Sequence, residues 1–195
     1  RSTLFPYTTL FRSVADADLV LDCADSFAVS YILSDCCLTA GKPLISASVL
    51  GLSGYVGGFC GGAPSLRAVF PDLPDTLATC ATAGVLGPIV GMFGLIQAQM
   101  ALAVLIGLEP SPLGQLIRYE MQGFRSTSFR FDNAPEPDAR FPFIARNALR
   151  PNDFIVDLRD EIEAPQAASP HAQRLTVEAI GPDTPLPAPN QRAVF

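Results

Sequence analysis

The chain has 195 residues, of which 49% are hydrophobic and 16% are charged, enough apolar material for a folded core. The net charge is −6 at pH 7 without a basic cluster, which argues against nucleic acid or an anionic membrane surface as a partner. Five cysteines without a Cys-x-x-Cys pair indicate reduced thiols, and hence a cytoplasmic protein rather than a disulfide framework; they are Cys23, Cys36, Cys37, Cys60 and Cys80.

Residues 3–13 read TLFPYTTLFRS, which resembles the in-frame translation of a sequencing-library adapter at every position. We therefore expect residues 1–13 to be an assembly artefact and the natural sequence to begin near Val14. A segment of this kind is set aside before the fold is considered.

Residues 18–51 predict a β-strand, an α-helix and a second β-strand. An apolar strand at 19–21 is followed by a helix that Ser26 caps and Gly41 ends, and a second apolar run covers 44–48. Two strands joined in this way should be parallel, with a right-handed crossover. The unit by itself is typical of a nucleotide-binding α/β half-domain.

Asp25 is the candidate site residue of this unit. Ligands of open parallel sheets bind outside the carboxyl ends of the strands. Asp25 is expected at that edge, beside a helix N-terminus that attracts phosphate. A carboxylate in this place usually binds a metal or a ribose. Alternatively, Asp25 only caps the helix, and Asp22 is expected to hydrogen-bond the local backbone.

Residues 84–108 form a long apolar segment without a charge. Its length would permit a membrane span, so a single-span membrane protein is one alternative. Pro88, Gln97 and Gln99 stand against a span, and no Lys or Arg flanks the segment. We expect instead a buried helix that packs on the sheet and, in a dimer, against a second subunit.

The remaining elements are predicted from turn residues and from alternation of apolar and polar side chains. In chain order they are a Gly-rich strand at 53–59, a turn at 60–65, the start of a loop at 67–70, two strands within 114–130 around a turn at 122–123, a linker at 133–142, a short helix or turn at 147–154, a buried strand at 155–159, a proline-rich segment at 182–190 and the start of a strand at 193–195.

Three sequence blocks resemble the ThiF/MoeB/HesA family of ubiquitin-activating-type adenylating enzymes. They are LVLDCADSF at 19–27, GKPLISASVLGLSGYV at 41–56 and TCATAGVLGPIVGMFGLIQAQMAL at 79–102. The resemblance covers residues 14–132 and corresponds to the C-terminal half of the family's domain. It implies an α/β fold, a partial doubly wound (Rossmann-like) sheet with packing helices.

The resemblance also implies an activity, that of a nucleotidyltransferase. In this family, ATP and magnesium serve to adenylate the C-terminal carboxylate of a ubiquitin-like sulfur carrier protein, with release of pyrophosphate. Sulfur is then installed on the carrier for thiamine or molybdopterin biosynthesis. The parent protein is accordingly expected to be a cytoplasmic homodimer.

The site residues that the resemblance implies are Asp25, Ser26 and Cys80. Asp25 matches the catalytic aspartate that engages the magnesium-triphosphate, and Ser26 stands beside it in the expected ATP site. Cys80 matches the position that in some members forms a covalent sulfur link with the carrier. A thiol before a Gly-rich turn and a helix could be more reactive than usual, or Cys80 could be an inert buried thiol.

The sequence also departs from the family pattern. Ser26 replaces an asparagine and Ser30 an arginine, and Ser65 and Ala68 stand where many members carry the first of two zinc-binding Cys-x-x-Cys pairs. Structural zinc is therefore predicted to be absent. The Gly-rich ATP loop should lie upstream of Val14, so we expect the chain to be inactive by itself. The alternative is a non-catalytic relative that binds a ubiquitin-like partner.

Residues 154–195 resemble the first part of a rhodanese-like domain. The blocks are IVDLRDEIEAP at 155–165, PHAQRLTVEAI at 170–180 and QRAVF at 191–195. The expected domains are thus an adenylating domain at 14–132, a linker at 133–142 and a truncated rhodanese-like domain at 143–195. His171 is expected at the surface. Cys23, Cys36 and Cys37 are expected to be buried core thiols, and Cys60 is expected to be a core or turn thiol.

Overall fold

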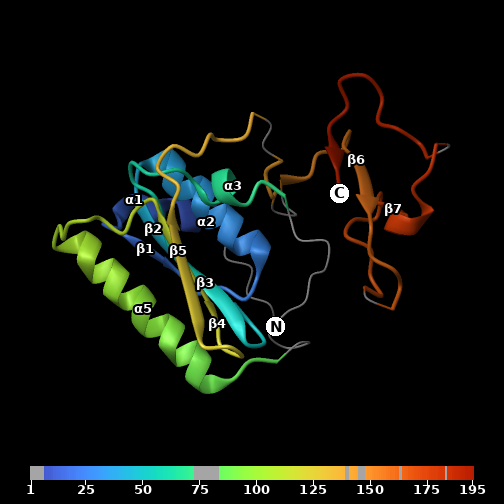
Figure 1. The fold of residues 1–195 in the computed structure, drawn as a ribbon. Helices are drawn as coiled ribbons and strands as arrows, with labels where there is room; N and C mark the ends of the chain where they lie inside the picture. The colour runs from blue at the N-terminus through green and yellow to red at the C-terminus, as the bar shows by residue number, and fades with distance from the viewer. Residues whose placement is uncertain (1–6, 73–83, 139–140, 145–147, 163, 183) are drawn as a thin grey trace. The chain divides into compact units, whose positions relative to one another are not determined.

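The computed structural model describes residues 7–72, 84–138, 141–144, 148–162, 164–182 and 184–195. Cys80 lies outside these residues. The chain divides into two compact units, Arg1–Phe143 and Ile144–Phe195, and each has its own sheet (Figure 1).

The N-terminal unit is built on one mixed five-stranded sheet. The strands lie in sequence order, and β1 is parallel to β2, whereas the other neighbours are antiparallel. The predicted parallel strand–helix–strand unit and the two predicted strands within 114–130 are therefore confirmed. The strands are β1 (Val20–Asp22), β2 (Pro43–Leu50), β3 (Ser53–Cys60), β4 (Gln115–Glu120) and β5 (Arg125–Arg130).

Helices cover both faces of this sheet (Figure 1). Leu44 of β2 belongs to a core cluster with α2 residues, and its neighbour Ile45 belongs to a second cluster with α5 residues. Because successive residues of a strand point to opposite faces, the two clusters form two separate layers of core. The helices are α1 (Tyr7–Asp16), α2 (Phe27–Ala40), α3 (Leu66–Val69) and α5 (Gly87–Leu105).

Helix α2 ends as predicted but begins differently. Gly41 adopts the left-handed conformation (φ 64°) that ends helices, and its backbone N–H reaches back to the carbonyl of Leu38. Ser26 occupies the N-cap position, yet its side chain makes no capping hydrogen bond. The predicted N-cap position of Ser26 is therefore confirmed, whereas the expected capping hydrogen bond from its side chain is not formed.

Helix α5 is only partly buried, although we expected a buried helix. Ile89, Phe93 and Met100 pack on the sheet, whereas the opposite side and the turn after the helix expose large apolar side chains. By length and composition alone α5 could cross a membrane, but its inner side is part of the core of an α/β sheet. The exposed side chains are Val90, Leu95, Leu102, Leu105, Ile106 and Leu108.

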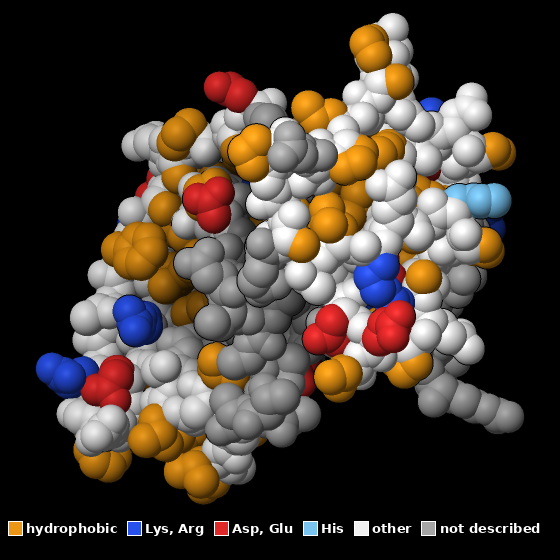
Figure 2. All heavy atoms as spheres, turned by 90° about the vertical axis from the view of Figure 1, so that its right-hand side faces the viewer, with side chains coloured by type: hydrophobic (Ala, Val, Ile, Leu, Met, Phe, Trp, Pro, Cys, Tyr) orange, Lys and Arg blue, Asp and Glu red, His pale blue; other side chains and the backbone are white. Residues whose placement is uncertain are grey.

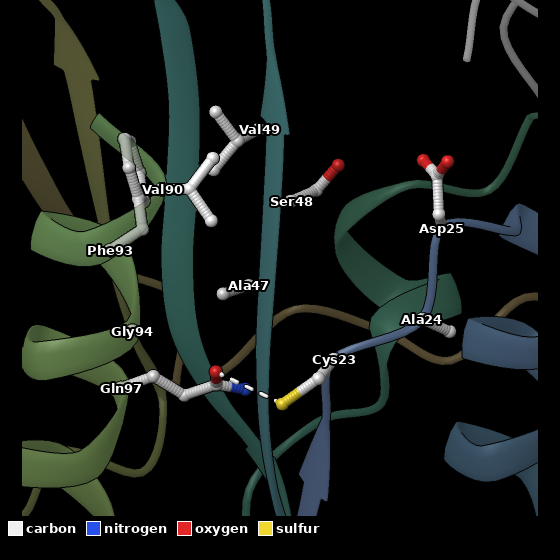
Figure 3. Close-up of a pocket in the computed structure, with 10 residues that line it drawn as sticks. All are labelled: Cys23, Ala24, Asp25, Ala47, Ser48, Val49, Val90, Phe93, Gly94 and Gln97. Atoms are coloured by element: carbon white, nitrogen blue, oxygen red, sulfur yellow. Dashed lines mark hydrogen bonds between the residues drawn. The ribbon is translucent and has the colours of Figure 1, made fainter. Parts of the chain in front are cut away.

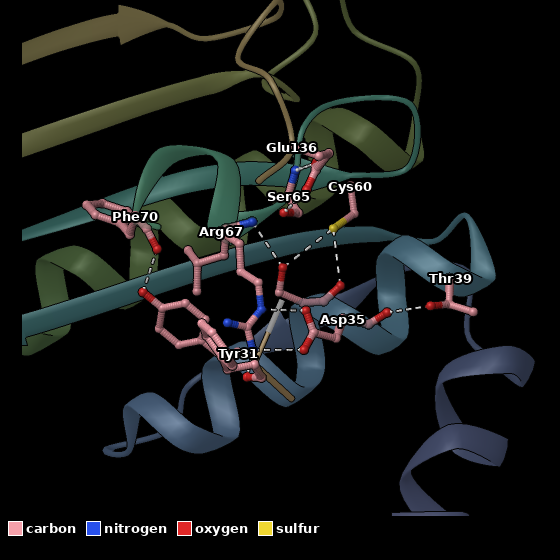
Figure 4. A network of polar contacts seen from close by, with 11 residues as sticks. Tyr31, Asp35, Thr39, Cys60, Ser65, Arg67, Phe70 and Glu136 are labelled. Atoms are coloured by element: carbon pink, nitrogen blue, oxygen red, sulfur yellow. Dashed lines mark hydrogen bonds and ion pairs between the residues drawn. The ribbon is translucent and has the colours of Figure 1, made fainter. Parts of the chain in front are cut away.

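Residues 66–69 form the short helix α3 instead of the start of a loop, because Arg67 is held from two sides (Figure 4). The Arg67 side chain is 8% exposed, and its guanidinium donates hydrogen bonds of 2.8 and 3.0 Å to the carboxylate of Asp35 and lies 4.7 Å from the ring centre of Tyr31. A bidentate ion pair of this kind is both strong and directional. It anchors α3 on α2.

Part of the segment predicted as a linker is bound to the same region. The backbone N–H and the hydroxyl of Ser65 both donate to the carboxylate of Glu136, at 2.7 and 2.6 Å, and Phe143 packs against the core beside Tyr31. Ser65 thus stands at the position of an expected family cysteine and is hydrogen-bonded to Glu136.

On the face drawn in Figure 2, the described basic side chains lie singly rather than in a cluster.

The C-terminal unit contains a small parallel sheet in the order β7-β6-β8. Its strands are β6 (Phe154–Asp157), β7 (Gln173–Arg174) and β8 (Ala193–Val194), and a 3-10 helix covers Val177–Ala179. The predicted buried strand near 155–159 and the strand at the C-terminus are confirmed. His171 is exposed, as expected.

Asp157 gives this unit a predicted pH dependence. Its buried carboxylate accepts hydrogen bonds from Arg159 (2.9 Å, twice) and from the backbone N–H of Ala168 (2.7 Å). The Arg159 hydrogen bond holds the Asp157 pKa far below its ordinary 3.8. Because the folded pKa is depressed, this stabilisation is complete above the ordinary pKa and is lost as the pH falls below it.

We therefore expect hydrogen exchange of β6 amides to accelerate as the pH falls from about 5 to about 2, after correction for intrinsic rates. Asp157→Asn should make this acceleration smaller. It should not abolish it, because Arg192 lowers the pKa of Asp153 in the same direction. An acid response of equal size in the variant would remove Asp157 as its cause.

Candidate functional site

The carboxyl end of β1 opens into a pocket of about 260 Å³ (Figure 3). Three segments far apart in the sequence line it, namely the turn after β1, the second half of β2 and the first half of α5. This is the sheet edge at which the sequence predicted a ligand. The lining residues are Cys23, Ala24, Asp25, Ala47, Ser48, Val49, Val90, Phe93, Gly94 and Gln97.

Asp25 lines this pocket and directly precedes the N-cap residue of α2. Figure 3 shows its carboxylate and the hydroxyl of Ser48 at the same end of the pocket, away from Gln97. The first backbone N–H groups of a 14-residue helix carry a partial positive charge. A carboxylate beside such a terminus suits a magnesium-bound phosphate, because magnesium commonly takes one or two carboxylates together with phosphate oxygens.

Asp22 fixes the turn that carries Asp25. Its carboxylate is fully buried and accepts hydrogen bonds from the hydroxyl of Ser46 (2.8 Å) and from the backbone N–H of Ala24 (3.1 Å). The prediction that Asp22 bonds the local backbone is confirmed. The Ser46 contact, 24 residues away, adds a link from the turn to β2.

Gln97 joins α5 to the end of β1 and to the first half of β2. Its Nε2 donates to the backbone carbonyls of Asp22 (2.7 Å) and Ile45 (2.9 Å), and its Oε1 accepts from the thiol of Cys23 (3.5 Å; Figure 3). In the sequence alone, Gln97 stands only against a membrane span. A buried amide in an apolar helix must find hydrogen-bond partners. A glutamine among apolar residues is therefore the sequence signal that could have indicated these tertiary hydrogen bonds.

The other two predicted site residues are Ser26 and Cys80, and the structure describes only Ser26. Ser26 is the N-cap of α2 but is absent from the pocket lining, and Ser30 donates its hydroxyl to the carbonyl of Ser26 within the helix (3.3 Å). Cys80 lies outside the described residues. Among the part of the chain that the structure describes, no three His, Cys, Asp or Glu residues gather as a metal cluster.

The described cysteines fall into two classes. Cys36, Cys37 and Cys60 are fully buried, as predicted, and burial raises the pKa of their thiols to about 11, 12 and 12. Cys23 is exposed, so its predicted core position is wrong. The physical reason is that β1 ends at Asp22, which leaves Cys23 in the turn at the pocket.

This difference predicts selective alkylation. Iodoacetamide near pH 8 should modify Cys23 at least about 100-fold faster than Cys36, Cys37 or Cys60, because alkylation requires an accessible thiolate. Peptide mass spectrometry of the native protein, with a urea-unfolded sample as control, measures each thiol separately. Equal native rates at Cys23 and Cys60 would contradict the described packing.

The mixed sheet, its helix layers on both faces and the pocket at the end of a parallel strand define a Rossmann-like α/β protein. The ThiF family profile matches residues 3–141, and the chain belongs to the ThiF family. The expected membership is thereby confirmed.

Among curated relatives, the adenylyltransferase and sulfurtransferase MOCS3 of Sus scrofa is 41% identical over 106 residues, covering 53% of this chain and 23% of that protein. The adenylyltransferase and sulfurtransferase uba4 of Emericella nidulans is 38% identical over 132 residues, covering 59% and 27%. The chain therefore spans about a quarter of the length of these relatives.

Solved structures of E. coli MccB share the fold. The crystal structure of MccB covers 73% of this chain and 45% of its own, with a TM-score of 0.56 and 16% identity. The structure of MccB with ATP gives a TM-score of 0.53 at 16% identity, covering 68% and 41%. At this identity the likeness concerns the fold, and it confirms the predicted α/β class.

Proposed function

We propose that the full-length protein adenylates the C-terminal carboxylate of a ubiquitin-like sulfur carrier protein, using ATP and magnesium. The observation that carries this proposal is Asp25, which lines a pocket at the carboxyl end of β1 beside the N-terminus of α2, inside a ThiF-family domain. The relatives named adenylyltransferase and sulfurtransferase support the same reaction. The product would serve thiamine or molybdopterin biosynthesis.

In this reaction a carrier carboxylate oxygen bonds to the α-phosphorus of ATP, and the bond to the pyrophosphate oxygen breaks. Magnesium, when bound, would neutralise charge on the triphosphate. Asp25 would hold the metal by one carboxylate, and the N-terminus of α2 would face the phosphates. We assign Ser26 to the same ATP site, because its hydroxyl makes no capping hydrogen bond to α2.

ATP–pyrophosphate exchange tests the proposal in the full-length protein. Radiolabelled pyrophosphate should enter ATP only when the carrier and magnesium are both present. Absence of exchange under these conditions would favour the alternative, a non-catalytic ThiF-like protein that binds a ubiquitin-like partner.

Two further assignments concern sulfur. We propose that Cys80 forms a covalent sulfur link with the carrier and that residues 143–195 are the first part of a rhodanese-like domain. The parallel arrangement of β7, β6 and β8, with Asp157 and Arg159 paired at the end of β6, supports the second assignment. Detection of a persulfide or a carrier conjugate on the Cys80 peptide would test the first.

The remaining assignments concern assembly and extent. We propose a cytoplasmic homodimer in which the exposed apolar side of α5 is covered, because apolar side chains gathered on one helix are typical of an interface. Sedimentation of the full-length protein tests the dimer.

We also propose that residues 1–13 are an assembly artefact. The family profile matches from residue 3 and therefore includes most of this segment. Re-sequencing the gene is the direct test of the proposal.

A further inference from the structure

Strand β1 is short and stands at the edge of the described sheet. It has three residues and pairs only with β2. Strand pairing alone therefore gives little support to the turn that follows it and that carries Asp25. The polar contacts around its last residue, Asp22, must supply the rest.

Gln97 makes the contacts that reach this end from the other layer. It is 4% exposed, and its amide nitrogen donates to both the Asp22 and the Ile45 carbonyls, at 2.7 and 2.9 Å. The bonded Asp22 carbonyl lies three residues before Asp25 in the chain. One side chain thus ties α5 to both parallel strands at the edge of the pocket.

We propose that Gln97 is a positioning residue that holds the turn carrying Asp25 in its reactive place. This inference rests on the proposed function, since it assigns Asp25 the task of binding magnesium-ATP. Gln97 acts through the backbone of Asp22 and the thiol of Cys23 rather than on the substrate. Mutating a residue that orients a metal-binding group typically lowers metal affinity or activity by about 10- to 100-fold.

Gln97→Met in the full-length protein tests the role, because methionine keeps the length and shape of the side chain and removes only the amide. ATP–pyrophosphate exchange should fall about tenfold, and the magnesium concentration for half-maximal exchange should rise several-fold. The matched control is Gln122→Met, since Gln122 is exposed in the turn between β4 and β5 and does not line the pocket. It should behave as wild type.

A double variant separates positioning from general packing. Gln97→Met combined with Asp25→Asn should be no slower than Asp25→Asn alone, because a residue that acts through Asp25 has nothing left to position. Multiplied losses would overturn the inference, as would an unchanged magnesium dependence in folded Gln97→Met. If Gln97→Met does not fold, Gln97→Asn replaces it, because asparagine keeps the amide on a side chain one methylene shorter. Exchange by Gln97→Asn is then compared with and without Asp25→Asn in the same way.

The result distinguishes this inference from the function on which it rests. Exchange that falls with Asp25→Asn but not with Gln97→Met overturns the role of Gln97 alone. No exchange in the wild-type protein with carrier and magnesium overturns the proposed function itself.

Discussion

Asp25→Asn in the full-length protein is expected to lower ATP–pyrophosphate exchange by about 100- to 1000-fold. Nucleotidyl transfer depends mainly on positioning the phosphates and neutralising their charge. Asparagine keeps the size of the side chain and removes the charge that would bind magnesium. The measurement is initial exchange rate against magnesium and ATP concentration, with the carrier saturating.

A second aspartate of the same region serves as the control. Asp18 is exposed and precedes β1, so Asp18→Asn should exchange at the wild-type rate. A full rate in Asp25→Asn, together with a lower melting temperature, would assign Asp25 to the start of α2 and remove its catalytic role. This outcome is the capping alternative that the sequence leaves open.

The predictions that succeeded rest on signals local in the sequence. The turn from α2 into β2 requires a left-handed residue, and Gly41 marks it. The helix between the first strand and the second makes them parallel neighbours, and this arrangement puts Asp25 at the carboxyl edge. The order of strand, helix and strand along the chain is therefore enough to predict where Asp25 lies.

The rest of the site depends on contacts between distant residues. Gln97 lies 74 residues from Cys23 and 75 from Asp22, and no local pattern pairs a helix residue with particular strand carbonyls. The same holds for α3, which Arg67 fixes through Asp35, 32 residues earlier. The apolar run of α5 was equally ambiguous, because composition does not tell a helix with one packed side from a helix buried all round.

Gly54 connects this packing to the pocket and gives the largest expected effect on stability. A Cβ at Gly54 would lie 2.3 Å from the carbonyl oxygen of Ser48 and 2.9 Å from the ring of Phe93. Phe93 is 1% exposed and packs edge-on against Tyr119 at 5.6 Å between ring centres, so it has little room to withdraw. Gly54→Ala should destabilise the N-terminal unit by about 2–3 kcal/mol.

Gly91→Ala is the control for Gly54→Ala, with the opposite expected sign. Urea unfolding measures the free energy of unfolding of both variants. A Cβ at Gly91 would meet nothing within 4 Å, and alanine favours a helix interior, so Gly91→Ala should stabilise by up to about 1 kcal/mol. Equal stability of Gly54→Ala and wild type would contradict the close contact of Gly54 with Ser48 and Phe93. Because Ser48 and Phe93 also line the pocket, Gly54→Ala in the full-length protein should raise the KM for ATP as well, which links the close packing of this sheet to the proposed nucleotide site.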